Sequence, residues 1–142
     1  MIILAFFFLL RPGEYTDNNK TPFCLKDIQL FIGPCSLNLQ TLSMAKLAQA
    51  PFGSLTFTDQ KNGVCGKVIG QALTGNSVIC LVKALVQCVL YLRSHNAPST
   101  TPLSWVFNTL ARVTPSVLTA TLRDCVQYLS PDLGFLPSEV SA

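Results

Sequence analysis

The chain has 142 residues, of which 49% are hydrophobic and 12% are charged, and its formal net charge is +3. This length suits one domain, or a piece of one, with a sizeable core, and the composition excludes an intrinsically disordered chain. So few charged residues also indicate a surface that a partner covers. The small positive charge permits contact with nucleic acid or an anionic membrane, but no dense basic block demands it.

The first ten residues, from Met1 to Leu10, are almost entirely apolar. A bilayer-spanning helix needs about twenty such residues, and a secretory signal carries a basic residue before its apolar run and a cleavage site after it. Neither pattern is met, so we expect a buried helix in an intracellular protein with no membrane contact. Because a helix that is apolar on all sides needs cover, we also expect a truncated start.

A charged pair follows this run directly in the segment Leu-Leu-Arg-Pro-Gly-Glu-Tyr, where Arg11 and Glu14 lie three residues apart. Unpartnered charges beside so apolar a segment are costly. The spacing lets Glu14 hold the guanidinium of Arg11, which then presents a rigid fork of donors suited to a phosphate.

The next segments predict a strand and a short helix. Residues 23–32 alternate in a strand-like way, with Asp27 as an interruption and Gly33-Pro34 as the closing turn. Residues 43–50 predict a short helix with Ser43 as its N-cap.

A β-hairpin is the clearest signal in the middle of the chain. Residues 54–58 alternate polar and apolar, Asn62-Gly63 is a favoured two-residue turn, and residues 64–69 supply the returning strand. Lys61 therefore stands at the expected tip of the hairpin.

The second half is predominantly helical. Residues 78–93 keep helical apolar spacing, residues 94–103 contain two prolines and predict a surface linker, and residues 105–110 fit a strand or a helix. Thr114 predicts the N-cap of a last helix that ends at Ser130-Pro131. Its expected apolar face consists of Val117, Leu118, Leu122, Val126 and Leu129. The whole pattern predicts an α+β protein, mainly helical, with a small antiparallel sheet.

The chain contains six cysteines, an even number that would suggest three disulfides in a secreted protein. None lies in a CxxC pair, and His95 is the only histidine. Cys80 and Cys88 lie about two helical turns apart, where they would pack as small apolar residues. We therefore expect reduced, mostly buried thiols and no zinc or other metal site.

Taken in order, these motifs resemble the catalytic domain of the tyrosine recombinases, the phage integrase-like family. The amino-acid sequences of the motifs are especially similar to those of integrase-like reading frames of eukaryotic mobile elements. The resemblance is carried by residues 6–15 (Phe-Phe-Phe-Leu-Leu-Arg-Pro-Gly-Glu-Tyr), 25–28 (Leu-Lys-Asp-Ile), 60–63 (Gln-Lys-Asn-Gly) and 80–85 (Cys-Leu-Val-Lys-Ala-Leu).

The resemblance implies DNA recombination and integration, in which a tyrosine attacks a phosphodiester and forms a 3′-phosphotyrosyl link. Arg11 matches the first arginine that clamps the phosphate, with Glu14 in support, and Lys61 matches the hairpin lysine that protonates the leaving 5′-oxygen. Lys67 and Arg93 are expected to add contacts to the DNA backbone. DNA is the implied partner, a nuclear location is implied in a eukaryote, and no metal or cofactor is implied.

The sequence also departs from the family pattern, because it contains no His-x-x-Arg box and no late tyrosine nucleophile. At Thr121-Leu122-Arg123 the histidine position falls on Ala120, and Tyr128 is expected on a helix face. We therefore interpret residues 1–142 as a partial catalytic domain, without the amino-terminal DNA-clamping domain and the carboxy-terminal catalytic part. Such a chain is expected to bind DNA but not to cleave it.

Two alternatives remain open at this point. In a small secreted or membrane-attached protein with three disulfides, Arg11 and Lys61 would carry no chemistry. The chain could also be an interaction fragment that pairs with an intact recombinase. Thiol titration under denaturing, non-reducing conditions separates the disulfide protein from the recombinase.

Overall fold

The computed structural model describes residues 2–8, 10, 16, 21–57, 66–76, 79–134 and 136–139, with only the backbone described for 130–133. The helices are α1 (Ile2–Phe8), α3 (Met44–Leu47), α4 (Leu81–Ser94) and α5 (Pro115–Leu133), with 3-10 turns η1 (Leu25–Asp27) and η2 (Pro137–Glu139). The strands are β1 (Ile28–Ile32), β2 (Cys35–Ser36), β3 (Phe52–Phe57), β4 (Lys67–Ala72), β5 (Trp105–Val106) and β6 (Ala111–Arg112). The predicted α+β class is confirmed, and α4 and α5 alone hold more residues than the six strands.

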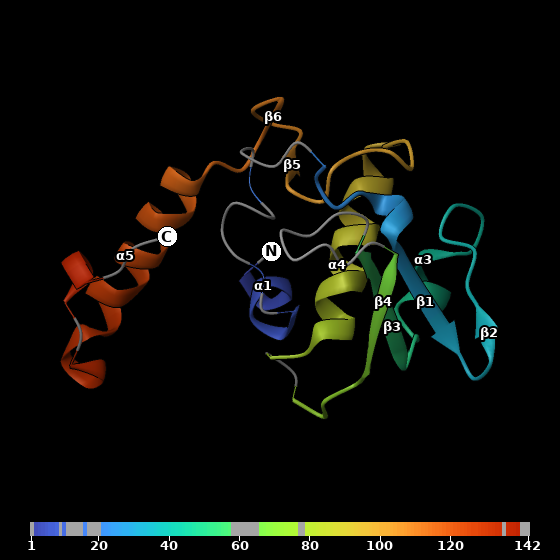
Figure 1. The fold of residues 1–142 in the computed structure, drawn as a ribbon, viewed down its shortest axis with the longest axis horizontal. Helices are drawn as coiled ribbons and strands as arrows, with labels where there is room; N and C mark the ends of the chain where they lie inside the picture. The colour runs from blue at the N-terminus through green and yellow to red at the C-terminus, as the bar shows by residue number, and fades with distance from the viewer. Residues whose placement is uncertain are drawn as a thin grey trace.

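The core lies between one face of the main sheet and helix α4. Four antiparallel strands have the order β2-β1-β3-β4, and α4 packs across β1, β3 and β4 (Figure 1). Leu85 of α4 lies against Gly53 of β3, where the buried side chain of Leu30 also approaches. The helical spacing that predicted α4 is therefore the spacing of its core-facing residues.

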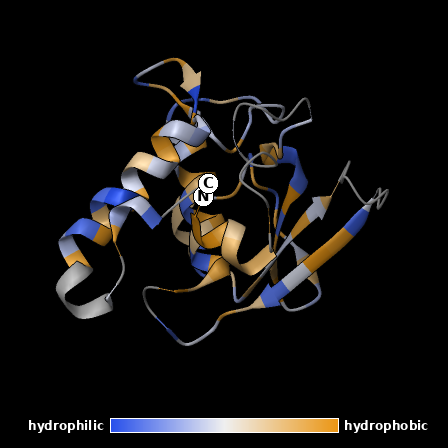
Figure 2. Ribbon diagram, turned by 60° about the vertical axis from the view of Figure 1, so that its left-hand side comes forward, coloured by the Kyte–Doolittle hydropathy of each residue, from blue (hydrophilic) through white to orange (hydrophobic). Residues whose placement is uncertain are grey.

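Helix α1 packs beside α4 and is buried on one face only. Leu4, Ala5 and Phe8 are buried, whereas the side chain of Phe6 is 69% exposed. In Figure 2 hydrophobic segments gather where α1 and α4 meet, and α5 carries both polar and hydrophobic residues. The expected burial of this helix is therefore confirmed for one face, and its other face is uncovered.

Asp27 shapes the entry into the sheet. Its Oδ2 accepts the backbone N–H of Cys24 at 2.7 Å, which closes η1 and delays the strand that we expected from residue 23 until Ile28. Gly33, at φ +57°, then supplies the tight turn into β2.

The predicted hairpin is present, but its returning strand is shifted. β3 and β4 pair from Phe52 with Ala72 to Phe57 with Lys67, so β4 covers residues 67–72 instead of 64–69. Gly70 hid the second half of this strand from pattern analysis, because glycine is unfavourable in strands unless pairing compensates. The expected Asn62-Gly63 turn lies outside the described residues.

Both predicted N-caps form, whereas the predicted helix ends were wrong. Ser43 accepts the N–H of Lys46 and Thr114 accepts the N–H of Val117 through their hydroxyls, at 3.3 Å and 3.2 Å. α3 ends at Leu47, and α5 continues past Pro131 to Leu133. A proline near a helix end removes only one backbone bond, and Gly134, at φ +68°, ends the helix instead.

Helix α5 extends away from the sheet and from α4 (Figure 1). Of its expected apolar face, Leu118 is buried, Leu122 and Val126 are half-buried, and Val117 and Leu129 are exposed. Its apolar face is therefore covered only in part.

The expected linker 94–103 does not simply cross the surface. The N–H groups of Leu25 and Lys26 donate to its carbonyls at 3.0 Å and 2.8 Å, and Thr101 and Leu103 are buried. The ambiguous segment 105–110 begins with β5 and turns into β6. Within the described part of the chain, every helix is too short or too polar to cross a membrane.

Candidate functional site

Three of the predicted functional residues, Arg11, Glu14 and Lys61, lie outside the described residues. Lys67 and Arg93 are described. The structure also describes the end of α1, which precedes Arg11 and Glu14 in the sequence, and the end of β3, which precedes Lys61.

Three phenylalanines join these two ends, and we call them the hairpin-base cluster: Phe8, Phe23 and Phe57. The ring of Phe57 is 1% exposed and meets Phe8 and Phe23 edge-on, with centroid distances of 5.7 Å and 5.2 Å. Leu10 is also buried, and its N–H donates to the Ala5 carbonyl at 2.9 Å. The cluster therefore places the end of α1 beside the last residue of β3.

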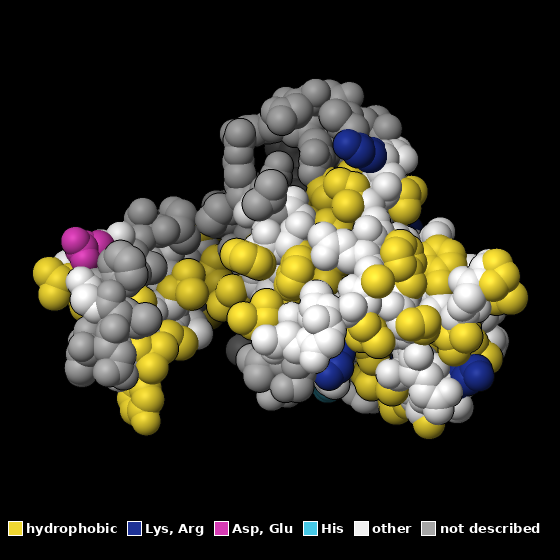
Figure 3. All heavy atoms as spheres, turned by 90° about the horizontal axis from the view of Figure 1, so that it is seen from below, with side chains coloured by type: hydrophobic (Ala, Val, Ile, Leu, Met, Phe, Trp, Pro, Cys, Tyr) yellow, Lys and Arg dark blue, Asp and Glu magenta, His cyan; other side chains and the backbone are white. Residues whose placement is uncertain are grey.

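Charge is distributed unevenly over the described residues 21–57, 66–76 and 79–112. The only carboxylate there is that of Asp27, which is 5% exposed and bound to a backbone N–H. The six cations are Lys26, Lys46, Lys67, Lys83, Arg93 and Arg112. In the view of Figure 3, acidic side chains appear only toward the α5 end. The basic side chains lie on the part that holds the sheet and α4, which we call the body. This imbalance creates a positive potential that attracts polyanions.

The two described candidates for DNA contact differ in their surroundings. Lys67 is exposed at the start of edge strand β4, opposite Phe57. The guanidinium of Arg93 donates to the Leu42 carbonyl through Nη1 at 2.6 Å, so it holds the segment before α3 against the end of α4. Pattern analysis did not reveal this structural use of Arg93, because Leu42 lies 51 residues away.

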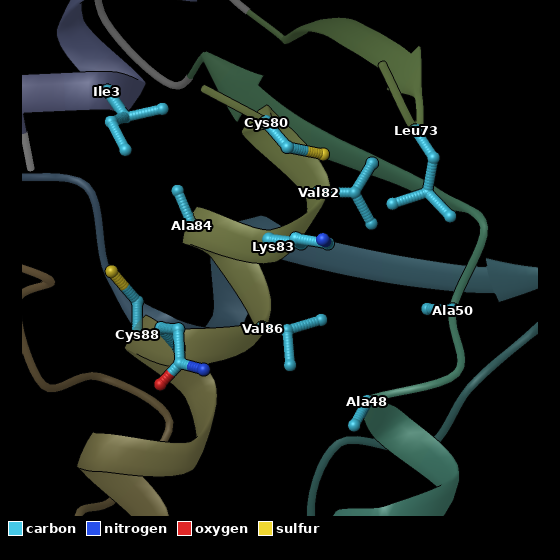
Figure 4. A pocket seen from close by; sticks show the side chains of 11 residues that line it. Ile3, Ala48, Ala50, Leu73, Cys80, Val82, Lys83, Ala84, Val86 and Cys88 are labelled. Carbon is cyan, nitrogen blue, oxygen red and sulfur yellow. The ribbon is translucent and has the colours of Figure 1, made fainter. Parts of the chain in front are cut away.

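A groove of about 550 Å³ lies between α4, Ile3 of α1 and the segments that precede β3 and follow β4 (Figure 4). Its walls are mainly apolar, Lys83 is its one charged lining residue, and Cys80 lies at the start of the helix. Burial raises the pKa of the Cys80 thiol, but hydrogen bonds with the backbone of Lys83 and with Thr74 outweigh this effect, so its pKa lies below the ordinary value. By contrast, burial raises the pKa of Cys24 and of Cys88.

All five described cysteines are free thiols. Cys24 and Cys80 are buried and Cys88 is half-buried, as expected, whereas Cys35 and Cys125 are exposed. The expectation of mostly buried thiols was therefore wrong for two of the five, and Cys65 lies outside the described residues. Within the described ranges, no three His, Cys, Asp or Glu side chains come together as a metal site would require.

Helix α5 carries Arg123 and Tyr128, the two residues that come closest in type to the second arginine and the tyrosine nucleophile of the family pattern. Arg123 is exposed, and the side chain of Tyr128 is 87% exposed. Tyr128 therefore lies on a helix surface, as the sequence predicted.

Comparison with known proteins finds no matching family model, no matching curated protein and no matching solved structure.

Proposed function

We propose that this chain is part of a tyrosine-recombinase-like catalytic domain and that it binds the DNA backbone through Arg11 and Lys61. The observation that carries the proposal is the contact between Phe8 and Phe57 in the hairpin-base cluster, at 5.7 Å. This contact joins the end of α1, which precedes Arg11, to the end of β3, which precedes Lys61. In the proposed domain Glu14 orients the guanidinium of Arg11.

Covalent geometry supports this pairing. Arg11 follows Phe8 by three residues and Lys61 follows Phe57 by four, and an extended chain spans at most about 3.6 Å per residue. Connections of three and of four residues can span at most about 11 Å and about 15 Å. This reach allows the two side chains to meet at one phosphodiester, where Arg11 neutralises the phosphate and Lys61 donates a proton to the leaving oxygen.

The charge imbalance of the body supports the same ligand. Cations outnumber carboxylates six to one over the described residues up to 112, and Lys67 is exposed at the hairpin base. Contacts of this kind bind phosphates with little dependence on base sequence and weaken as salt rises. Lys67, and the donors of Arg93 that do not bind Leu42, extend the proposed interface.

The 142-residue chain by itself is proposed to bind DNA without cutting it. Covalent strand exchange needs a tyrosine nucleophile and a second phosphate-binding arginine, and the sequence has no His-x-x-Arg motif. Among its tyrosines, Tyr91 accepts the N–H of Phe107 through its hydroxyl at 3.0 Å. Tyr128 lies on the exposed surface of α5.

Binding of a fluorescent duplex DNA at graded salt tests the proposal. We expect Arg11→Gln and Lys61→Gln each to weaken binding and to reduce the salt slope by about 1, because each removes one phosphate contact. Lys83→Gln removes an equal charge from the α4 groove and serves as the control. Unchanged binding in both variants, or strand cleavage by the 142-residue chain, would overturn the proposal.

A second candidate function is pairing with an intact recombinase. It is favoured by exposed apolar side chains of α1 and α5, namely Ile2, Phe6 and Val117, and by a cavity of about 550 Å³ between the two helices. Co-expression with a full-length recombinase of this type would test it. Complex formation that Phe6→Ser and Val117→Ser abolish is the expected result, and two separate proteins would refute it.

A further inference from the structure

Among the described strands, β2 and β4 are the two outer strands of the main sheet, and their free edges differ in length. β2 has two residues, which leaves little edge for another strand. β4 has six residues, contains no proline and carries its one charge at its first residue, Lys67. Proteins commonly protect an edge strand with prolines, charges or short length, because an open edge pairs with other chains. Most of β4 has none of these protections.

The free edge of β4 presents the backbone groups of three residues. The N–H of Leu73 donates to the Pro51 carbonyl at 2.9 Å, which fixes the phase of the hydrogen bonds between β3 and β4. Because these bonds alternate along an antiparallel pair, Val68, Gly70 and Ala72 direct their N–H and C=O groups away from β3. All three residues are exposed, and within the described part of the chain no further strand pairs with them. The edge therefore offers unpaired donors and acceptors in a row.

A second copy of the same strand is complementary to this edge. When two β4 strands run antiparallel with Gly70 opposite Gly70, Val68 of each copy lies opposite Ala72 of the other. Three pairs result, each with two hydrogen bonds, so every outward N–H and C=O of the three residues finds a partner. A shift of one strand by two residues leaves one of the three residues in each copy without such a pair. The arrangement centred on Gly70 is therefore the favoured register.

The side chains of β4 also suit this register. Lys67 lies opposite Leu73 of the second copy, so the two lysines stand at opposite ends of the paired strands, about 20 Å apart, and do not repel each other closely. Phe52 of β3 lies beside Ala72 in the sheet, and Val68 of the second copy continues this apolar row. In the single chain Val68 is 55% exposed and Phe52 is 38% exposed. Pairing therefore covers apolar surface and brings no like charges together.

We propose that two copies of this chain pair through β4 and form a dimer with one continuous antiparallel sheet. Each copy contributes its four-stranded sheet, and the two-fold axis passes between the two Gly70 residues. The same surface is used by both copies, so the assembly is closed and neither β4 keeps a free edge. The proposal does not depend on DNA binding.

Sedimentation velocity at graded protein concentrations, under reducing conditions, tests the dimer. Val68→Pro removes the N–H that bonds to Ala72 of the second copy and places the proline ring where the second strand would lie. We expect it to raise the dimer dissociation constant at least about tenfold. The pairing of β4 with β3 keeps its bonds, because this N–H points away from β3. Val68→Thr retains the N–H and the side-chain shape, so it is the matched control and should dimerise like the parent. A parent protein that is monomeric at every concentration, or equal association of Val68→Pro and the parent, would refute the proposal.

A disulfide test checks the register without a proline. In the proposed dimer Lys67 and Leu73 of different copies form a non-hydrogen-bonded pair, with Cα atoms about 4.5 Å apart, a distance that a disulfide can bridge. Within one copy the same two residues lie about 20 Å apart along the strand, which is too far. In a chain that carries Cys35→Ser, Cys65→Ser and Cys125→Ser, we expect Lys67→Cys combined with Leu73→Cys to form a covalent dimer on oxidation. Each single substitution is the control, and crosslinking as efficient as that of the double variant would overturn the proposed register.

The exposed apolar side chains of α1 and α5 offer a different contact surface, and the same measurement separates the two. Phe6→Ser changes α1 and leaves β4 intact, so we expect it to retain the parent dissociation constant. A dimer that Phe6→Ser abolishes and Val68→Pro leaves intact would refute pairing through β4.

Discussion

Asp27 shows how one side chain sets the path of the chain into the sheet. Its carboxylate is buried and accepts the N–H of Cys24, while the N–H of Asp27 itself donates to the Cys24 carbonyl at 3.0 Å. This pair of bonds closes the turn before β1. A buried carboxylate is tolerated here because it has a donor within the fold.

Asp27→Ala should therefore lower the free energy of unfolding by about 1–3 kcal/mol, since it leaves the Cys24 N–H buried without a partner. Chemical denaturation measures the change. Asp124→Ala removes an exposed carboxylate on α5 and should change the free energy by less than about 0.5 kcal/mol. Equal effects of the two substitutions would show that the bond to Cys24 contributes no stability.

The thiols predict a pH dependence of stability. Burial raises the folded-state pKa of Cys88 and of Cys24 above the ordinary value, so the unfolded chain ionises first. Their contribution is complete below the unfolded pKa and is lost as the pH rises through the folded pKa. Cys80 has the opposite sign, because its pKa is lowered and its contribution appears as the pH rises.

Cys88→Ala should therefore flatten the decline in the free energy of unfolding as the pH rises above the ordinary pKa of a thiol, about 8.5. Denaturation across this range under reducing conditions provides the measurement. Cys35→Ala, which removes an exposed thiol, is the matched control substitution. A Cys88→Ala curve that is parallel to the parent curve would contradict the prediction.

At the scale of elements, the hairpin-base cluster connects parts of the chain that are distant in sequence. Phe57 ends β3, Phe8 ends α1 and Phe23 precedes η1, and the ring of Phe57 meets each of the other two edge-on. Edge-to-face aromatic pairs add to the free energy that burial already provides. The cluster thus links the helix, the hairpin and the entry to the sheet in one contact.

Phe57→Ala should lower the free energy of unfolding by about 3–5 kcal/mol, because it empties a fully buried ring site between three elements. Phe6→Ala, which truncates an exposed ring on α1, should cost far less. Urea denaturation of both variants makes the comparison. A small effect of Phe57→Ala would mean that the cluster does not join α1 to the hairpin.

At the scale of the whole molecule, the described residues up to 112 are mainly cationic, and the described acidic groups other than Asp27 lie at the α5 end. Asp124 and Glu139 are the described carboxylates besides Asp27, and both lie in or beyond α5. If DNA is the ligand, as proposed, these described charges favour the sheet and α4 over α5 as its binding surface. This asymmetry cannot be seen in the net charge of +3, which averages over both regions.

Replacing Lys26, Lys46 and Lys67 together by Gln should reduce the salt slope of duplex binding by about 0.9 for each phosphate contact that is lost. All three side chains are exposed on the body. Lys83→Gln provides the control, as before. A slope equal to that of the parent protein would place the DNA on another surface.

Local rules predicted much of the fold. Helical spacing identified α4, hydroxyl N-caps located the starts of α3 and α5, and polar-apolar alternation identified β3. These features depend on residues a few positions apart, so the sequence alone contains the necessary information. The candidate residues Arg11 and Lys61 came from sequence motifs, and their roles remain predictions.

Tertiary structure decided what depends on distant partners. The position of β4 follows its pairing with β3, and Arg93 is held by a carbonyl 51 residues away. The ring of Phe52 can lie over Gly70 only because two strands place a glycine opposite its neighbour Ser54. Such contacts are set by the packing of the whole chain, because spacing along a sequence does not specify which residues meet across a sheet.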